Sequence, residues 1–501
     1  MSSPQEYSTI FSAPAEHNDK KPPKKPLLKR LLATLLAVCL IAGVTVAVVK
    51  LIPEKARDDN TDSSFEVINI DSANIATAEV IEDQNKIIFV SELVEGESKS
   101  ETVWQVSGTD KDLTDSDKIK SAVESASKIN AIKIIEGNIA DYGLEAPKLT
   151  INFTAANAAF ENFSVLVGNT APAGLGYYCK ISNKDAIYLV DNDFSVLFSC
   201  SPLDFADTTG ISGIEQTTEN ADCFSDGSLV LFDYIKLSGQ NYNGLTIVPQ
   251  TDEKINSYFA YKITSPSVRI GSDTAVNELL TIATNGIASS GAYCFNPTAA
   301  DIAKYKLNNP YATFEISVKG KVYTIKAAKV DDTYFAVMAN GDNMIHKIPA
   351  ASVSFASGQT TDYYSSFIIL ENLSGLSGFN VAFQNGQSYN FKTEYNNENE
   401  SYKAYLGDSE LDIENFKKLY RQFIELTPAE YDSKAINGAA LTINLVHSDG
   451  TPNTVVEFKV YSPQRYQVEL DGIPMGLITA STYEKFAQNI KNTAQGNPVA
   501  E

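Results

Sequence analysis

The chain has 501 residues, of which 43% are hydrophobic and 10% aromatic, a composition that excludes an intrinsically disordered protein. A chain of this length exceeds one ordinary core, so two to four domains are expected. Residues 1–52 carry seven basic and three acidic side chains, so residues 53–501 hold a charge of −26 within the net −22. A body this acidic repels nucleic acid, and its simplest consequence is solubility.

The N-terminal part of the chain predicts a membrane anchor. Residues 1–30 are polar and contain five prolines, which is typical of a disordered tail. Residues 31–49 form a run of 19 residues without a charge. A helix rises about 1.5 Å per residue, so this run nearly covers the hydrocarbon core of roughly 30 Å. With the apolar pair at 51–52 included, we predict a transmembrane helix over 31–52.

The charges around this run predict its orientation. Six basic residues precede it within residues 20–30. Such a bias places the N-terminus in the cytoplasm and the C-terminal body outside the cell membrane, which makes this a single-pass protein. Residues 53–64 are polar and charged and are expected to form a short stalk.

Two other interpretations of the apolar run stay open. A cleaved signal peptide normally has an apolar core of about 7–15 residues that ends at small residues, and this run is longer. Lipoprotein processing at Cys39 would need a small residue just before the cysteine, where the sequence has Val38.

A nine-residue pattern occurs twice in the body. Residues 139–147 are IADYGLEAP and residues 302–310 are IAKYKLNNP, so five of the nine positions agree. Each copy follows a helical pattern and precedes alternating strand patterns, which indicates a repeated structural unit. The shared residues are apolar or tyrosine, so we interpret the motif as structural and place Tyr142 and Tyr305 in the core.

The strand and helix patterns around the motif predict three related modules, at 65–210, 225–370 and, in a more divergent form, 375–495. Each begins with three strands, continues with a helix and ends with four strands. Alternating apolar and polar side chains are typical of an antiparallel sheet with one solvent-exposed face. The helix would cover the other, apolar face. The predicted fold class is therefore α+β: one N-terminal transmembrane helix followed by repeated modules of mainly antiparallel sheet with a covering helix.

Three predictions concern individual residues of the modules. Thr114 and Asp117 resemble a capping box at the start of the first module's helix. Trp104, the only tryptophan, is expected to anchor the first core. Tyr431 stands where the third module should have its motif tyrosine.

The cysteines of the body do not form a metal motif. Their spacing has no CxxC pair and no zinc pattern. An even number of cysteines outside the membrane permits disulfides. We nevertheless predict unpaired thiols, because Cys179 lies in a strand-like segment, a typical position for a buried free thiol. The four cysteines of the body are Cys179, Cys200, Cys223 and Cys294.

Catalytic motifs are also missing from the sequence. The two histidines of the body, His346 and His447, lie on or beside predicted strands of different modules, where a histidine is usually exposed or half-buried. No nucleophile elbow, phosphate loop or metalloprotease motif occurs. We therefore predict no catalytic, cofactor-binding or metal-binding residues and no enzymatic activity, although glycosidase carboxylates leave no spacing pattern by which to exclude them.

The first module resembles a bacterial family known as domain of unknown function 4340. The resemblance rests on Trp104-Gln105-Val106, a following helix, Tyr142-Gly143-Leu144-x-x-Pro147, Val167-Gly168 and the strand at 176–179. It covers about 78–205, weakens in the second module, where Lys306 replaces the glycine, and is faint in the third. It implies an extracytoplasmic, membrane-tethered protein of the kind often found beside auxiliary subunits of gliding-type ABC transport systems. No catalytic residue is implied.

Two functions follow as hypotheses. The leading one is a membrane-anchored extracytoplasmic binding or scaffold protein, accessory to an ABC-type transport system, with envelope or transporter proteins as partners. The alternative is a cell-surface module that binds wall polymer or glycan through exposed tyrosine and asparagine. Residues 361–364, Thr-Asp-Tyr-Tyr, are its candidate contact, and buried tyrosines are the competing interpretation there.

Overall fold

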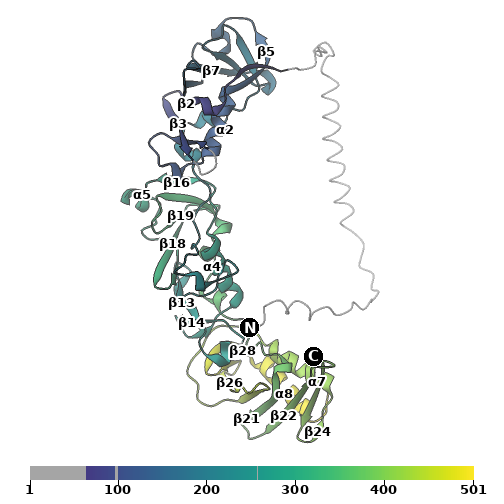
Figure 1. The fold of residues 1–501 in the computed structure, drawn as a ribbon. Coiled ribbons are helices and arrows are strands. Elements are labelled where there is room, and N and C mark those ends of the chain that lie inside the picture. The colour runs from purple at the N-terminus through teal and green to yellow at the C-terminus, as the bar shows by residue number, and fades with distance from the viewer. Residues whose placement is uncertain (1–63, 96–99, 257, 501) are drawn as a thin grey trace. The chain divides into compact units, whose positions relative to one another are not determined.

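The computed structural model describes residues 64–95, 100–256 and 258–500 (Figure 1). The predicted tail, the transmembrane helix and almost all of the stalk lie outside these residues. Within the described ranges no helix is long and apolar enough to cross a membrane.

The described chain is mostly antiparallel sheet with a few helices, so the α+β part of the predicted fold class is confirmed. The first sheet has nine strands in the order β1-β5-β9-β8-β7-β6-β2-β3-β4. Its strands are β1 (Phe65–Asn69), β2 (Ile75–Glu82), β3 (Asn85–Glu95), β4 (Ser100–Val106), β5 (Lys128–Ile135), β6 (Leu149–Ala155), β7 (Phe163–Thr170), β8 (Tyr177–Ile181) and β9 (Ile187–Val190).

The second sheet also has nine strands, in the order β16-β20-β19-β18-β17-β12-β13-β14-β15. A separate hairpin, β10 (Phe224–Ser225) with β11 (Ser228–Leu229), precedes it. The strands of the sheet are β12 (Tyr234–Gly239), β13 (Tyr242–Pro249), β14 (Tyr261–Ser265), β15 (Arg269–Ile270), β16 (Ala292–Phe295), β17 (Ala312–Val318), β18 (Lys321–Lys329), β19 (Tyr334–Ala339) and β20 (Met344–Pro349).

The third sheet has eight strands, in the order β28-β27-β26-β25-β21-β22-β23-β24. They are β21 (Leu376–Phe383), β22 (Ser388–Asn396), β23 (Ser401–Leu406), β24 (Ser409–Glu410), β25 (Leu441–His447), β26 (Thr454–Ser462), β27 (Arg465–Leu470) and β28 (Ile473–Thr479).

The three sheets share one strand order. In each, the last four strands along the chain run inward from one side, and strands that precede the helix continue outward from the centre: β2 to β4, β12 to β15 and β21 to β24. The first strand of the chain, β1, is an addition to this order and pairs outside β5. The strand after the helix, β5 or β16, pairs outside the last strand in the first two sheets. In the third sheet a single bridge between Glu430 and Leu477 stands in that place. The sheets are therefore copies of one unit, while the exact module boundaries stay a prediction.

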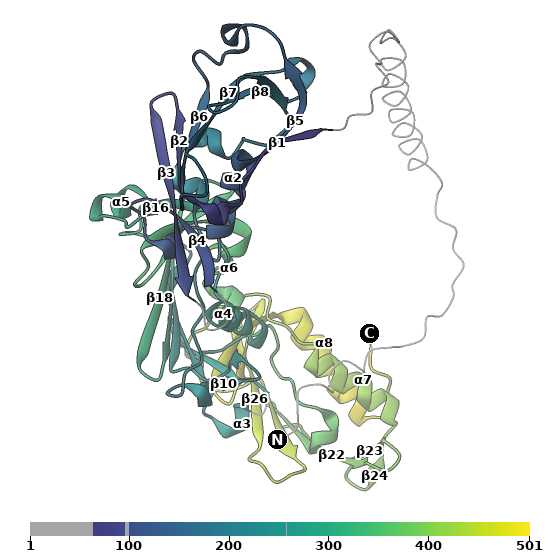
Figure 2. The same ribbon diagram turned by 45° about the horizontal axis from the view of Figure 1, so that its top comes forward.

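The four longer helices and the short helix α5 (Ala299–Lys304) begin at side-chain caps. The longer ones are α2 (Ser116–Ser127), α4 (Asp273–Asn285), α7 (Ile413–Ile424) and α8 (Ala480–Ala494), and the other short ones are α3 (Glu253–Asn256) and α6 (Ser354–Ser357). The predicted capping box at Thr114 is wrong, because the Asp115 side chain accepts from the Lys118 amide instead. Trp104 is fully buried beside Ile119 and Val123 of α2, as expected. Figure 2 shows α7 and α8 side by side against the third sheet.

The repeated motif forms a turn that holds a leucine in the core. In the first copy a 3₁₀ helix, Ile139–Tyr142, ends at Gly143 with a left-handed φ of 73°. Leu144 then points inward and is 2% exposed. A side chain at Gly168 in β7 would overlap the carbonyl oxygen of Tyr142, so this close approach requires the glycine.

The second copy has the same geometry with a less suitable residue. Lys306 takes the glycine's place and adopts a φ of 59°, and Leu307 is 1% exposed. Tyr142 and Tyr305 are half-buried, so their placement in the core is wrong. Each packs at a tilt against another tyrosine at the surface of the turn, Tyr142 against Tyr178 and Tyr305 against Tyr293. The core residue of the motif is the leucine.

Candidate ligand-binding groove

A groove lies beneath α8, at one end of the third sheet. Its volume is about 550 Å³, within the usual range for ligand sites. The sheet contributes Phe383, Gln384, Asn385, Ala440, Val460 and Tyr466, and the helix contributes Tyr483, Glu484, Ala487, Gln488 and Lys491. These segments are far apart in the sequence and meet because β21, β25, β26 and β27 are neighbours in the sheet.

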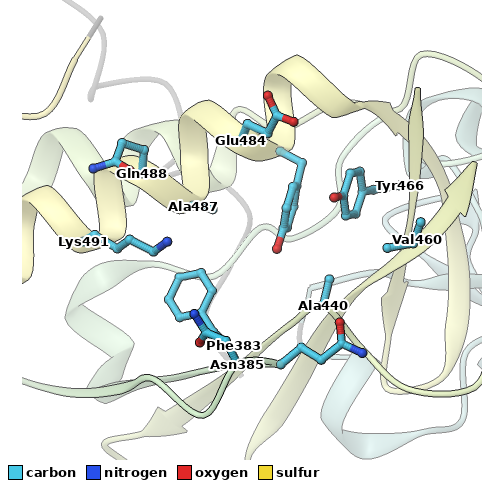
Figure 3. Close-up of a pocket in the computed structure, with 11 residues that line it drawn as sticks. Phe383, Asn385, Ala440, Val460, Tyr466, Glu484, Ala487, Gln488 and Lys491 are labelled. Atoms are coloured by element: carbon cyan, nitrogen blue, oxygen red, sulfur yellow. The ribbon is translucent and has the colours of Figure 1, made fainter. Parts of the chain in front are cut away.

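Helical periodicity aligns the α8 side chains along the groove. Residues three, four and seven apart share one face of a helix. Tyr483 and Ala487 are buried against the sheet, while Glu484 and Gln488 are exposed along the rim. The ammonium of Lys491 lies 5.0 Å from the ring centre of Phe383, and the two side chains face each other across the groove (Figure 3).

Two stacked tyrosines form the inner wall. The rings of Tyr466 and Tyr483 are 3.8 Å apart and inclined by only 15°. Burial, with the nearby Tyr466 and Glu484, raises the pKa of Tyr483 to about 12, and burial also raises the pKa of Tyr466. Both hydroxyls therefore stay protonated at neutral pH. Neither is hydrogen-bonded to another residue in the part of the chain that the structure describes, so both can bond to a ligand.

The polar groups of the groove are mostly amides and hydroxyls, which can both donate and accept hydrogen bonds. Three side-chain amides, Gln384, Asn385 and Gln488, each offer donors and an acceptor. Glu484 is the only carboxylate among the described lining residues, and no histidine or cysteine accompanies it.

The tyrosines at 361–364 lie elsewhere and are not available to a ligand. Tyr363 and Tyr364 are 5% and 8% exposed, so the competing interpretation of buried tyrosines is confirmed. Tyr363 packs against Tyr242, and Tyr364 packs against Tyr431. Tyr431 itself lies ten residues before β25, whereas the motif tyrosines lie seven residues before β6 and β17, so it does not occupy the motif position.

The remaining candidates for chemistry are dispersed. All four cysteines of the body are free thiols, as predicted. His346 is buried, which the sequence did not suggest. Across the described ranges no group of three histidine, cysteine or acidic side chains could hold a metal ion.

His447 belongs to a buried polar cluster where the second and third sheets meet. Its Nδ1 lies 3.5 Å from Oε2 of Glu371, and its Nε2 lies 3.0 Å from Oγ1 of Thr454 and 3.2 Å from the Tyr258 hydroxyl. Thr454 is completely buried, so a substrate could not reach its hydroxyl. The cluster has the bonding order of a catalytic triad, and its contacts connect Tyr258, which follows β13, to β25 and β26 of the third sheet.

The cluster predicts a pH dependence of stability. Burial raises the pKa of Glu371, and this effect outweighs the opposing hydrogen bond with Tyr258 and the charge of His447. A carboxyl with a raised folded pKa stabilises the fold below its unfolded pKa, and this contribution is lost as pH rises through the folded value. Glu371→Gln cannot ionise, so we expect its stability relative to the wild type to increase between about pH 4 and pH 7. Urea unfolding at both values measures this, and a difference that does not change with pH would contradict it.

The comparisons with known proteins concern the first module. No curated protein matches the chain, and no solved structure does. Residues 104–222 match the model of a family described as a domain of unknown function, DUF4340. The matched range starts at Trp104 and contains the Tyr-Gly-Leu turn and Gly168, whose packing is described above. Over these residues the chain carries a domain of the DUF4340 family.

Proposed function

We propose that the protein is a membrane-anchored, extracytoplasmic binding protein without a catalytic centre, and that the groove beneath α8 binds a neutral glycan chain. The lining of the groove carries this proposal. It presents two free tyrosine hydroxyls and three amides, and its two charges, Glu484 and Lys491, have opposite signs. The uncharged run at 31–49 and the basic residues before it support the anchor.

Sugar hydroxyls both donate and accept hydrogen bonds, as do the amides and hydroxyls of this groove. A highly charged ligand would find no net countercharge. The groove has a single carboxylate, which supports binding without hydrolysis, because glycosidases require two carboxyl groups that flank the bond. Of the two functions that the sequence suggests, glycan binding is the one that the lining of the groove supports.

Removal of the two free hydroxyls tests the site. Tyr466→Phe with Tyr483→Phe keeps the stacked rings but deletes two hydrogen-bonding groups, each worth about 1 kcal/mol. We expect the full-length protein in detergent to bind chitotetraose or maltotetraose roughly 10–100-fold more weakly by calorimetry.

The matched control is Tyr395→Phe with Tyr402→Phe. These two rings also pack together, at 4.6 Å, but they lie on β22 and β23 outside the groove. Affinity should be unchanged in this control. Equal losses in both double variants, or no loss in either, would contradict the proposed site.

The second candidate is an accessory role beside an ABC-type transport system. It is supported by the resemblance of the first module to its family rather than by the groove. Photocrosslinking from the first module in intact cells separates the two, because an accessory protein should capture a transporter subunit even when the groove tyrosines are replaced.

A further inference from the structure

Three side chains with complementary chemistry meet on β26 and β27. Lys459 and Gln467 are directly opposite in the antiparallel register, and Glu469 follows two residues after Gln467 on the same face. The Lys459 ammonium lies 2.6 Å from Oε2 of Glu469, and the Gln467 amide nitrogen lies 2.7 Å from Oε1 of the same carboxylate. One carboxylate therefore contacts both an amine and a carboxamide.

The environment of this cluster is largely shielded from water. Gln467 is fully buried, and the side chains of Lys459 and Glu469 are 12% and 10% exposed. Directly opposite residues of antiparallel strands have Cβ atoms about 4.5–5.5 Å apart, so the lysine side chain can reach the carboxamide carbon of Gln467.

The carboxamide is also polarised. Its oxygen accepts a hydrogen bond from the backbone N–H of Lys434 at 2.9 Å, and its nitrogen donates to the backbone oxygen of Lys434 at 3.1 Å. A backbone N–H in this position would stabilise negative charge that develops on the oxygen during attack at the carbon.

We propose that Lys459 and Gln467 form an intramolecular isopeptide bond. Glu469 accepts a proton from the Lys459 ammonium, and the neutral amine attacks the carboxamide carbon of Gln467. The new C–N bond forms while the bond to the original amide nitrogen breaks. The attacking nitrogen then gives up a second proton, and Glu469 delivers both protons to the departing nitrogen, which leaves as ammonium, so no oxidant or other reactant is required.

The charges around Lys459 limit the rate of this reaction. Burial lowers the pKa of Lys459, but hydrogen bonds to Glu469 and Glu457 together raise it above its usual value. The resting amine is therefore protonated, and Glu457, 3.1 Å away, opposes its deprotonation. The reaction is a slow, single event for each chain.

The crosslink would stabilise the wall of the groove. Lys459 immediately precedes Val460, and Gln467 immediately follows Tyr466, so the bond closes the loop that carries both of these lining residues. The inference goes beyond the proposed function, since it concerns a covalent modification that can occur with or without a ligand.

Intact mass spectrometry of the full-length protein tests the inference. We expect a mass lower than that of the sequence by one ammonia, and a tryptic product in which Lys459 is not cleaved and is linked to the peptide that contains Gln467. The loss should be absent in Lys459→Arg and Glu469→Gln and faster in Glu457→Gln.

Asn–Gly sequences, such as Asn385-Gly386, can also lose ammonia by cyclisation, so the position of the loss is decisive. An unchanged mass after prolonged incubation at neutral and alkaline pH would overturn the proposal. A loss that persists in Lys459→Arg or maps to an Asn–Gly pair would overturn it equally.

Discussion

Replacement of Leu307 by alanine will lower the free energy of unfolding by about 2–5 kcal/mol, the usual cost of truncating a fully buried leucine. Leu307 packs in a small cluster with Ala328, Ala336 and Ile345, where small neighbours cannot fill the space it leaves. Chemical denaturation of the full-length protein, monitored by circular dichroism, measures the change.

The exposed neighbour Asn309 provides the control for this prediction. Asn309→Ala should change stability by less than about 0.5 kcal/mol, because its side chain faces solvent. Leu144→Ala should have the same large effect in the first module, since that leucine occupies the equivalent place after the turn. A small effect in both leucine variants would refute the assignment of leucine as the structural centre of the motif.

Replacement of Arg269 by alanine should be nearly as damaging, with an expected loss of about 2–4 kcal/mol. Arg269 lies on the edge strand β15 of the second sheet and is buried. Its guanidinium donates to the Pro474 carbonyl at 2.8 Å and to the Ser433 hydroxyl at 2.8 Å, both in the third module. The substitution removes both bonds and leaves a buried carbonyl without its donor.

A second arginine separates this effect from a general loss of charge. Arg465 pairs with Glu430 in the third module, but the pair is partly exposed to solvent. Arg465→Ala should therefore cost no more than about 1 kcal/mol. If the two variants unfold at the same denaturant concentration, Arg269 does not join the second and third sheets.

The main pattern of the fold could be predicted from the sequence because it is local. The sequence patterns located several elements correctly. Alternating apolar and polar side chains predicted β2, β6 and β17, and helical spacing of apolar residues predicted α2 and α7. The strands β1 and β5 were missed. Their pairing is interrupted by a bulge, and β5 directly follows α2 without a turn residue, so neither shows regular alternation.

The errors in the motif have a related cause. Tyrosine is the most conspicuous shared residue, yet its hydroxyl needs a polar partner, and Tyr142 finds one at the carbonyl of Glu136 at the surface. The smaller leucine carries no polar atom and takes the interior position.

The groove could not be predicted from the sequence. Phe383 and Lys491 are more than a hundred residues apart, and nothing in the local pattern of either indicates the other. The helical periodicity of α8 predicts which of its side chains share a face, but only the strand order of the third sheet brings Tyr466 and Asn385 opposite that face.

The most direct test of the account is a titration of the full-length protein with neutral oligosaccharides, followed by recovery of the sugar. Saturable binding of chitotetraose or maltotetraose, with the recovered chain length unchanged, is the predicted result. Absence of saturable binding to any neutral oligosaccharide, or recovery of shortened chains, would contradict the claim that the groove beneath α8 binds glycan without cleaving it.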